Sequence, residues 1–327
     1  MTNTAMAFWV VEPGRGELRP VELAEPKADE VLVRSLFSLI SQGTERLVWR
    51  GGVPADQHAV MRAPHQEGDF PGPVKYGYLN VGVVEAGPAD LLGRTVFCLY
   101  PHQSAYVVPV DAVTLVPTQV PPRRAVLAGT VETAVNALWD AAPLVGDRIS
   151  VVGAGLVGCC VARLLSGIPG TRVTLVDIEP TRSAVAHELG VGFALPADAP
   201  GEQDLVFHAS ATGAGLQLSL DRLATEGSVI DLSWYGDTDV TLSLGGSFHS
   251  GRLALSSSQV GRVSPARRAR RTPAQRLALA LDLLADPAYD ALLSQDCDLA
   301  ELPAVMASLA GGGRRTIGQV VTYPARP

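Results

Sequence analysis

The stretch RISVVGAGLVG, residues 148–158, lies near the middle of this 327-residue chain and decides its fold. Its apolar start predicts a short buried strand, and the apolar run 156–165 predicts a helix. Gly153, Gly155 and Gly158 give the spacing G-x-G-x-x-G between the two. The first glycine permits a tight turn, the second lets the backbone approach a pyrophosphate, and the third lets the helix pack closely on the strand. The alternative is a glycine-rich turn that binds nothing.

A second apolar run, residues 172–176, ends in Asp177, nineteen residues after Gly158. A carboxylate at this distance accepts a hydrogen bond from the ribose 2′-hydroxyl and repels a 2′-phosphate, so it predicts NAD(H) rather than NADP(H). Arg182, in the next expected helix, weakens this preference. The expected cofactor-binding residues are Gly153, Gly155, Leu156, Val157, Gly158, Asp177, Ile178, Arg182, Ser210, Leu232 and Ser233.

Strands and helices alternate from residue 149 to residue 233, which predicts the parallel, doubly wound sheet of a Rossmann domain. Before it the chain is rich in β-strand patterns, and a long polar loop is expected at 41–73. We expect a dinucleotide-binding domain at 121–286 and a β-rich domain built from 1–120 and 287–327. The strands expected in the first part are 5–11, 30–39, 81–86, 95–99, 106–109 and 114–116. Residues 123–142 are expected to form a helix that is broken at Gly129.

The composition suits a globular protein of about two domains, with 47% hydrophobic and 18% charged residues. A net charge of −7 argues against nucleic acid as a partner, and no apolar run is long enough to span a membrane. Residues 1–11 lack the pattern of a signal peptide, so a cytoplasmic location is expected. The four cysteines form no C-x-x-C pair, so neither a disulfide framework nor a four-cysteine zinc site is supported.

Three further motifs resemble the medium-chain dehydrogenase/reductase superfamily, and with the mid-chain Rossmann unit the resemblance covers nearly the whole chain. SQGTE at 41–45 looks like its Cys-x-Gly-Thr-Asp catalytic turn. GYLNVGVVEAG at 77–87 looks like its Gly-His-Glu…Gly-x-Val…Gly segment, and ETAVNA at 132–137 looks like a helix of the polyol dehydrogenases. SQGTERLVW at 41–49 is locally closest to the branch that oxidises a hydroxyethyl side chain in bacteriochlorophyll synthesis. The resemblance implies a GroES-like β-rich catalytic domain beside the Rossmann domain.

The chain departs from that family at its catalytic zinc site. Where the family has a Cys, a His and a Glu, this chain has Ser41, Tyr78 and Leu79. Glu132 survives at a position that some members use as a ligand, but Zn²⁺ needs three protein ligands from Cys, His or carboxylate. The family's structural-zinc lobe is also missing, because residues 98–106 form only a short connection. The resemblance therefore implies a zinc-independent member with no metal site.

Without a metal, a side chain must manage the proton that accompanies hydride transfer. Tyr78 replaces the zinc-binding His, and its phenol can donate to a developing alkoxide. We expect Lys75 to lower the pKa of that phenol, Thr44 to relay a proton, and Glu132 to act as a buried base or an orienting acceptor. The alternative is structural: Tyr78 packs, Lys75 is solvated, and Glu132 holds the turn at Ser41.

The long loop provides the expected substrate contacts. Ser41, His65 and Trp49 are the candidates for substrate binding. His58 and His102 also lie in or beside the expected active-site loops, although a loop histidine is usually a surface residue.

The leading hypothesis is a zinc-independent, NAD(H)-dependent alcohol dehydrogenase or ketone reductase acting on a secondary alcohol or ketone of a small metabolite. The alternatives are an enoyl (double-bond) reductase that uses NAD(P)H and a non-catalytic dinucleotide-binding protein. Neither the substrate nor the direction of hydride transfer follows from the sequence.

Two features of the C-terminal third concern partners. The expected strand at 253–260 presents an apolar edge, and in the resembling family this strand pairs across a two-fold axis, so a homodimer is expected. The segment 262–276 carries six arginines in an acidic chain, which indicates a solvated face, an anionic substrate or a subunit contact.

Overall fold

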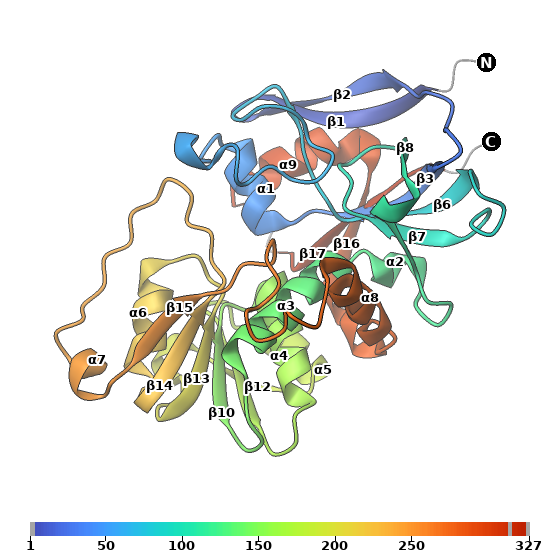
Figure 1. The fold of residues 1–327 in the computed structure, drawn as a ribbon. Helices are drawn as coiled ribbons and strands as arrows, with labels where there is room; N and C mark the ends of the chain where they lie inside the picture. Colours follow the sequence, from blue (N-terminus) through green and yellow to red (C-terminus); the bar gives the residue numbers. More distant parts are fainter. Residues whose placement is uncertain (1–3, 313–315, 325–327) are drawn as a thin grey trace. The chain divides into compact units, whose positions relative to one another are not determined.

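The computed structural model describes residues 4–312 and 316–324. The chain divides into two compact units, of which unit 1 comprises 1–129 and 293–327 and unit 2 comprises 130–292 (Figure 1). The sequence placed the domain boundaries at 120/121 and 286/287, whereas the two units of the structure divide at 129/130 and 292/293. Within the described ranges, no helix is both long and apolar enough to cross a membrane.

Unit 1 is built from two sheets of mostly antiparallel strands, with orders β2-β1-β5-β4 and β16-β17-β3-β6-β7-β9; β8 pairs with β3. The expected strand at 30–39 is confirmed residue for residue as β3. The strands are β1 (Thr4–Glu12), β2 (Arg15–Glu22), β3 (Glu30–Leu39), β4 (Glu67–Gly68), β5 (Val74–Lys75), β6 (Asn80–Ala86), β7 (Thr95–Cys98), β8 (Ala105–Pro109), β9 (Val113–Leu115), β16 (Leu293–Asp298) and β17 (Gly318–Thr322).

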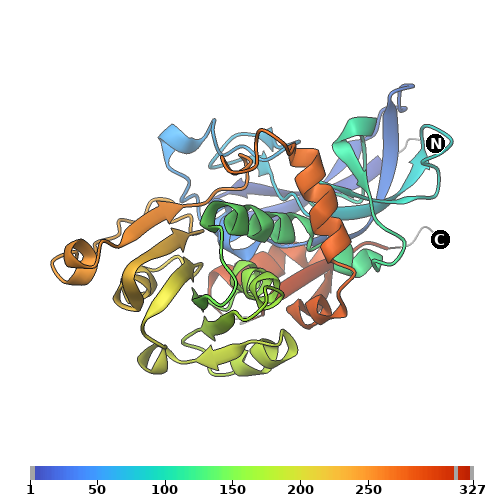
Figure 2. The same ribbon diagram turned by 60° about the horizontal axis from the view of Figure 1, so that its bottom comes forward.

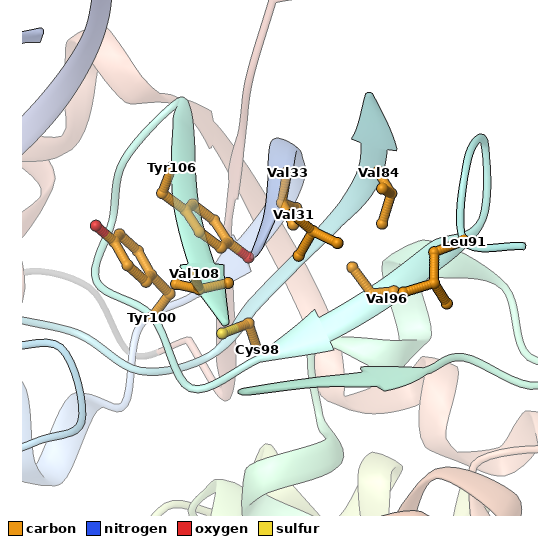
Figure 3. Packing of buried hydrophobic residues seen from close by; sticks show 9 residues of the cluster. All are labelled: Val31, Val33, Val84, Leu91, Val96, Cys98, Tyr100, Tyr106 and Val108. Carbon is orange, nitrogen blue, oxygen red and sulfur yellow. The ribbon is translucent and has the colours of Figure 1, made fainter. Parts of the chain in front are cut away.

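A core cluster of unit 1 lies where β3, β6, β7 and β8 meet (Figure 3). Alternate residues of these strands point to one face, as a period of two requires. The stacked rings of Tyr100 and Tyr106, with centroids 3.8 Å apart, close one end of the cluster. Its buried residues are Val31, Val33, Val84, Leu91, Val96, Cys98, Tyr100, Tyr106 and Val108.

The prediction of a long polar loop at 41–73 was wrong in part. The segment begins with helix α1, in which Leu47, Val48 and Trp49 are buried, so burial of one face overrides the unfavourable Gly43 and Thr44 at its start. The helical segments of unit 1 are α1 (Gln42–Trp49), η1 (Ala55–Gln57), η2 (Val110–Ala112), α2 (Pro122–Ala125), η5 (Leu299–Glu301) and α9 (Leu302–Ala310). Helix α3 (Ala128–Ala141) begins at the end of unit 1 and continues into unit 2.

Unit 2 contains one parallel sheet with the order β12-β11-β10-β13-β14-β15, so the strand order reverses between β10 and β13. Ligands of doubly wound sheets bind at such a reversal, at the carboxyl ends of the strands. The strands are β10 (Arg148–Val152), β11 (Arg172–Val176), β12 (Gly192–Ala194), β13 (Gln203–His208), β14 (Leu223–Asp231) and β15 (Ala254–Ser257).

Helices connect the strands of this sheet, and one face of it packs on α6. Val152, Val206 and Val229 form a buried cluster with Leu216 and Leu220 of α6. Helices α3 and α8 run next to each other (Figure 2). The helical segments of unit 2 are α4 (Leu156–Ser166), α5 (Arg182–Glu188), η3 (Pro196–Asp198), α6 (Gly213–Asp221), α7 (Ser247–Ser250), α8 (Pro273–Leu283) and η4 (Pro287–Leu292).

The three glycines at the end of β10 meet different steric demands. Gly153 has φ +108°, and a Cβ there would lie 2.8 Å from the backbone of Ala209 and Ser210. A Cβ on Gly158 would lie 1.9 Å from the carbonyl oxygen of Gly153, so only glycine lets the first turn of α4 approach the strand this closely. Gly155 has open space around its Cβ position. Close packing within the protein therefore does not require glycine at position 155.

We predict that Gly158→Ala lowers the free energy of unfolding by about 3 kcal/mol, because the added methyl group meets backbone rather than a movable side chain. Gly155→Ala, three residues away, should cost no more than about 1 kcal/mol, the usual effect of changing a helix N-cap. Urea unfolding of both variants measures the difference. Equal losses would contradict the assigned packing role of Gly158.

Candidate functional site

The N-terminus of α4 in unit 2 presents backbone groups with open space beside Gly155. Gly155 is the exposed N-cap of this helix, and Leu156 and Val157 in its first turn are partly buried. The backbone N–H groups of a helix's first turn have no partner inside the helix and attract an anion. The empty Cβ position of Gly155 leaves room for a phosphate group against the backbone.

Asp177, at the end of β11, is fixed beside this turn. Its Oδ2 accepts a hydrogen bond from the backbone N of Ala154 at 2.7 Å, and its Oδ1 accepts one from the backbone N of Glu179 at 2.9 Å. The next residue, Ile178, is 84% exposed although it is apolar. An acidic group with an exposed apolar neighbour fits the ribose and base of an adenosine. Arg182 follows in α5 and is partly buried.

A polar cluster joins the ends of β13 and β14. The ring of His208 is fully buried, with Nδ1 at 2.9 Å from Oδ1 of Asp231 and Nε2 at 2.7 Å from Oγ of Ser210. Ser233 donates its backbone N–H to Asp231 at 2.9 Å, and the hydroxyl of Tyr235 donates to the same carboxylate at 2.9 Å. The cluster therefore fixes the loop ends that border the strand reversal.

The charge on Asp231 sets the direction of these bonds. Burial would raise the Asp231 pKa, but hydrogen bonds from His208, Ser233 and Tyr235 outweigh it, so the pKa lies below its usual value. An ionised carboxylate only accepts, so His208 donates to Asp231 from Nδ1, and its Nε2 shares a hydrogen bond with the Ser210 hydroxyl. That hydroxyl faces Gly215, where a Cβ would lie 2.2 Å from it. The side chain of Ser210 is thus engaged within unit 2, and Leu232 lies between two members of the cluster.

The catalytic candidates Tyr78, Ser41 and Thr44 come together in unit 1. The Tyr78 phenol donates to Oγ of Ser41 at 2.6 Å and also hydrogen-bonds Thr44. Burial raises the pKa of Tyr78, the Ser41 and Thr44 hydroxyls partly oppose this, and the net shift is upward. The phenol is therefore protonated at neutral pH and can act as a hydrogen-bond and proton donor.

A buried chain of hydrogen bonds supports this group and was missed by the sequence analysis. Glu45 accepts the backbone N–H of Ser41 at 2.8 Å, and its other oxygen lies 2.9 Å from Nε2 of His102. Nδ1 of His102 lies 2.7 Å from Oγ of Ser38, whose hydroxyl also meets that of Tyr323 at 2.7 Å. The only sequence signal was Glu45 at the acidic position of SQGTE; nothing local pairs it with a histidine 57 residues away.

Lys75 does not have the partner that the sequence suggested. Its fully buried ammonium group contacts Glu67, Oε1 of Gln103 at 2.8 Å and the ring of Tyr100 at 5.2 Å. Burial lowers the pKa of Lys75, although Glu67 counteracts this. Since Tyr78 is not among these contacts, the expected pairing of Lys75 with Tyr78 was wrong. His65 belongs to the same cluster, with its exposed ring 5.2 Å from that of Tyr100.

Trp49 and Glu132 have partners of their own. Trp49 is 4% exposed and stacks on Phe8, which favours core packing over substrate contact. Glu132 lies in unit 2 and forms a buried ion pair with Arg276, with Oε1 3.0 Å from Nε. Burial raises the Glu132 pKa above its usual range, and Arg276 opposes the shift. Glu132 is therefore occupied as the partner of a buried guanidinium.

The phenol of Tyr78 has the hydroxyl groups of Ser41 and Thr44 as its neighbours. Ser41 and Tyr78 carry hydroxyl groups and Leu79 is apolar, and none of the three is a usual zinc ligand. Across residues 4–312 and 316–324, no three His, Cys, Asp or Glu side chains gather as a metal ion would require. The four cysteines are buried, and none of them is in a disulfide.

No family model and no curated protein matches the sequence. The fold matches solved dehydrogenase structures over 98% of the chain. A short chain alcohol dehydrogenase from Escherichia coli CFT073 complexed with NADH is 16% identical, with a TM-score of 0.78 over 98% of this chain and 99% of that chain. A protein from Sinorhizobium meliloti 1021 bound to NADP is 17% identical, with a TM-score of 0.77 over the same shares.

2R,3R-butanediol dehydrogenase from Bacillus subtilis is 14% identical, with a TM-score of 0.77 over 98% of this chain and 100% of that chain. At these identities the likeness concerns the fold. The chain has the fold of these dehydrogenases, a GroES-like β-rich domain with a Rossmann domain, and the expected fold class is confirmed.

Removing the charge of Glu132 should destabilise the protein. We predict that Glu132→Ala lowers the free energy of unfolding by about 3–5 kcal/mol, because Arg276 is left as an unpaired buried charge. Glu226→Ala, which breaks an exposed ion pair with Arg252, should cost less than about 1 kcal/mol. Urea unfolding compares the two variants. A loss no larger in Glu132→Ala than in its control would show that the pair is not structural.

Proposed function

We propose that this protein is a zinc-independent, NAD(H)-dependent oxidoreductase that transfers hydride between the nicotinamide and a secondary alcohol or ketone of a small molecule. The observation that carries the proposal is the glycine turn at the N-terminus of α4, with the Asp177 carboxylate fixed on its backbone. The likeness in fold to structures that hold NADH and NADP supports it.

The chain's own residues suggest how the cofactor is held. The backbone of Gly155, Leu156 and Val157 would bind the pyrophosphate at the helix N-terminus. Asp177 would accept from the ribose hydroxyls, while Ile178 offers an apolar surface to the adenine. The bound nicotinamide supplies or accepts the hydride. These groups fit NAD(H) better than NADP(H), because the Asp177 carboxylate repels a second phosphate.

Tyr78 is the proposed proton donor to the substrate oxygen. Its raised pKa keeps the phenol protonated, which suits it to donate to the oxygen of a ketone as hydride arrives. Ser41 and Thr44 bind the phenol oxygen with hydroxyl groups that both donate and accept, so either can return a proton to Tyr78. Zinc independence rests on the residue types: Ser41, Tyr78 and Leu79 offer no set of Cys, His or carboxylate ligands.

We also propose a homodimer through β15. This strand ends the sheet, and all of its residues are exposed, including Leu255 at 39%. The unpaired backbone edge of such a strand pairs readily with a second copy. The strand spans Ala254–Ser257, shorter than the expected 253–260.

The first test of this function is Tyr78→Phe. We expect a fall of about 100-fold or more in kcat for an alcohol or ketone that the wild type turns over, because a general acid typically contributes that much. Affinity for NADH, measured by calorimetry, should not change. Tyr76→Phe is the matched control: its ring packs edge-on to Tyr78 at 6.0 Å but lacks the Ser41 contact. Full activity in Tyr78→Phe would remove the proposed donor.

The second test concerns cofactor choice. Asp177→Ala should weaken NADH binding about tenfold and reduce the preference over NADPH, since it removes both the acceptor and the repulsive charge. Asp198→Asn removes an exposed carboxylate in η3 and should leave both affinities as they are. Titration with NADH and with NADPH measures the ratio of the two dissociation constants. A ratio that stays the same in Asp177→Ala would contradict the assignment of NAD(H).

A further inference from the structure

The arginine-rich segment between β15 and α8 carries positive charge that no carboxylate among the described residues pairs with. Arg267, Arg268, Arg270 and Arg271 are exposed, and within the described ranges none of them pairs with a carboxylate. Arg267 and Arg270 reach only the carbonyl oxygen of Ala266. Four neighbouring guanidinium groups repel one another, and in a chain with a net charge of −7 they form a local cationic site.

Buried contacts hold this segment in place. Nη1 of Arg276 donates to Oδ1 of Asn136 at 2.5 Å, and Nη2 of the same guanidinium donates to the carbonyl oxygen of Val260 at 2.5 Å. The backbone N of Ser264 donates to Asn136 at 3.0 Å. The Thr272 capping box then begins α8. Since both ends are fixed, the arginines are presented by an ordered segment of chain.

A cavity of about 470 Å³ lies against this segment, within unit 2. Its walls come from α3, from the arginine segment and from α8, which run next to one another (Figure 2). This volume falls in the range of small-molecule sites. The lining residues are Trp139, Arg267, Arg270, Arg271 and Leu279.

We propose that this cavity binds a small organic anion that carries a phosphate or carboxylate group on a planar or apolar body. Guanidinium groups bind such oxyanions in a bidentate manner, and three of them line the same cavity. Trp139 and Leu279 provide an aromatic face and an apolar wall for the rest of the molecule. This site is separate from the glycine turn, because none of its lining residues belongs to the expected cofactor-binding set.

Phenyl phosphate is a probe with both required features, and phenol is its uncharged counterpart. Calorimetry at low ionic strength should show phenyl phosphate binding at least about tenfold more tightly than phenol, with an affinity that falls as KCl is added. The Arg270→Gln/Arg271→Gln double variant should lose at least about tenfold in affinity. Arg267→Lys should lose part of it, because lysine keeps the charge but not the bidentate geometry.

Two controls identify the site. Arg252→Gln removes an exposed arginine elsewhere in unit 2 and should bind phenyl phosphate like the wild type. Gly155→Ala alters the glycine turn and should also leave this binding unchanged, which separates the cavity from the proposed cofactor site. Undiminished binding in the double variant, or equal binding of phenol and phenyl phosphate, overturns the proposal. It is also overturned if the double variant changes the sedimentation coefficient but not phenyl phosphate binding, which would make the arginines a subunit contact.

Discussion

The close approach of α4 to β10 is the contact on which the structure of unit 2 depends. It requires glycine at 158 because the carbonyl oxygen of Gly153 occupies the place of a side chain. The same turn brings Gly153 against the backbone of Ala209 and Ser210, so it also sets the position of the β13 loop. Asp177 then binds the N–H of Ala154. The glycine turn, the Asp177 carboxylate and the loop after β13 are thereby fixed relative to one another by contacts within unit 2.

Three acidic side chains with little exposure to solvent are held in pairs, in both units. Glu132 has Arg276, Asp231 has His208, and Glu45 has His102. An unpaired buried charge is strongly destabilising, whereas a fully satisfied network gives a defined geometry. These pairs therefore restrict which side chains remain available for chemistry. In unit 1 the Tyr78 phenol, protonated and held by two hydroxyl groups, is the proposed proton donor.

The sequence predicted helices and strands well where neighbouring residues showed a clear apolar pattern. It missed elements whose formation depends on packing against distant parts of the chain. Strand β3 at 30–39 has a strong apolar pattern and was predicted at its full length. Strand β2 was missed because RGELRPVE has few apolar residues and contains Pro20, which an edge strand tolerates. The helix expected at 123–142 is divided into α2 and α3. Its break lies before Ala128, and Gly129 instead lets α3 pack against Leu79.

The sequence by itself determined the fold class, the glycine spacing and which residue types stand at positions 41, 78 and 79. These follow from short-range spacing and residue chemistry, which any conformation of the chain preserves. Only the tertiary structure decided which groups meet: Lys75 lies on Glu67 rather than Tyr78, and Glu132 meets a guanidinium 144 residues away. The partner of a buried charged side chain depends on long-range packing, because the ion pair forms with the oppositely charged group that the fold places nearby.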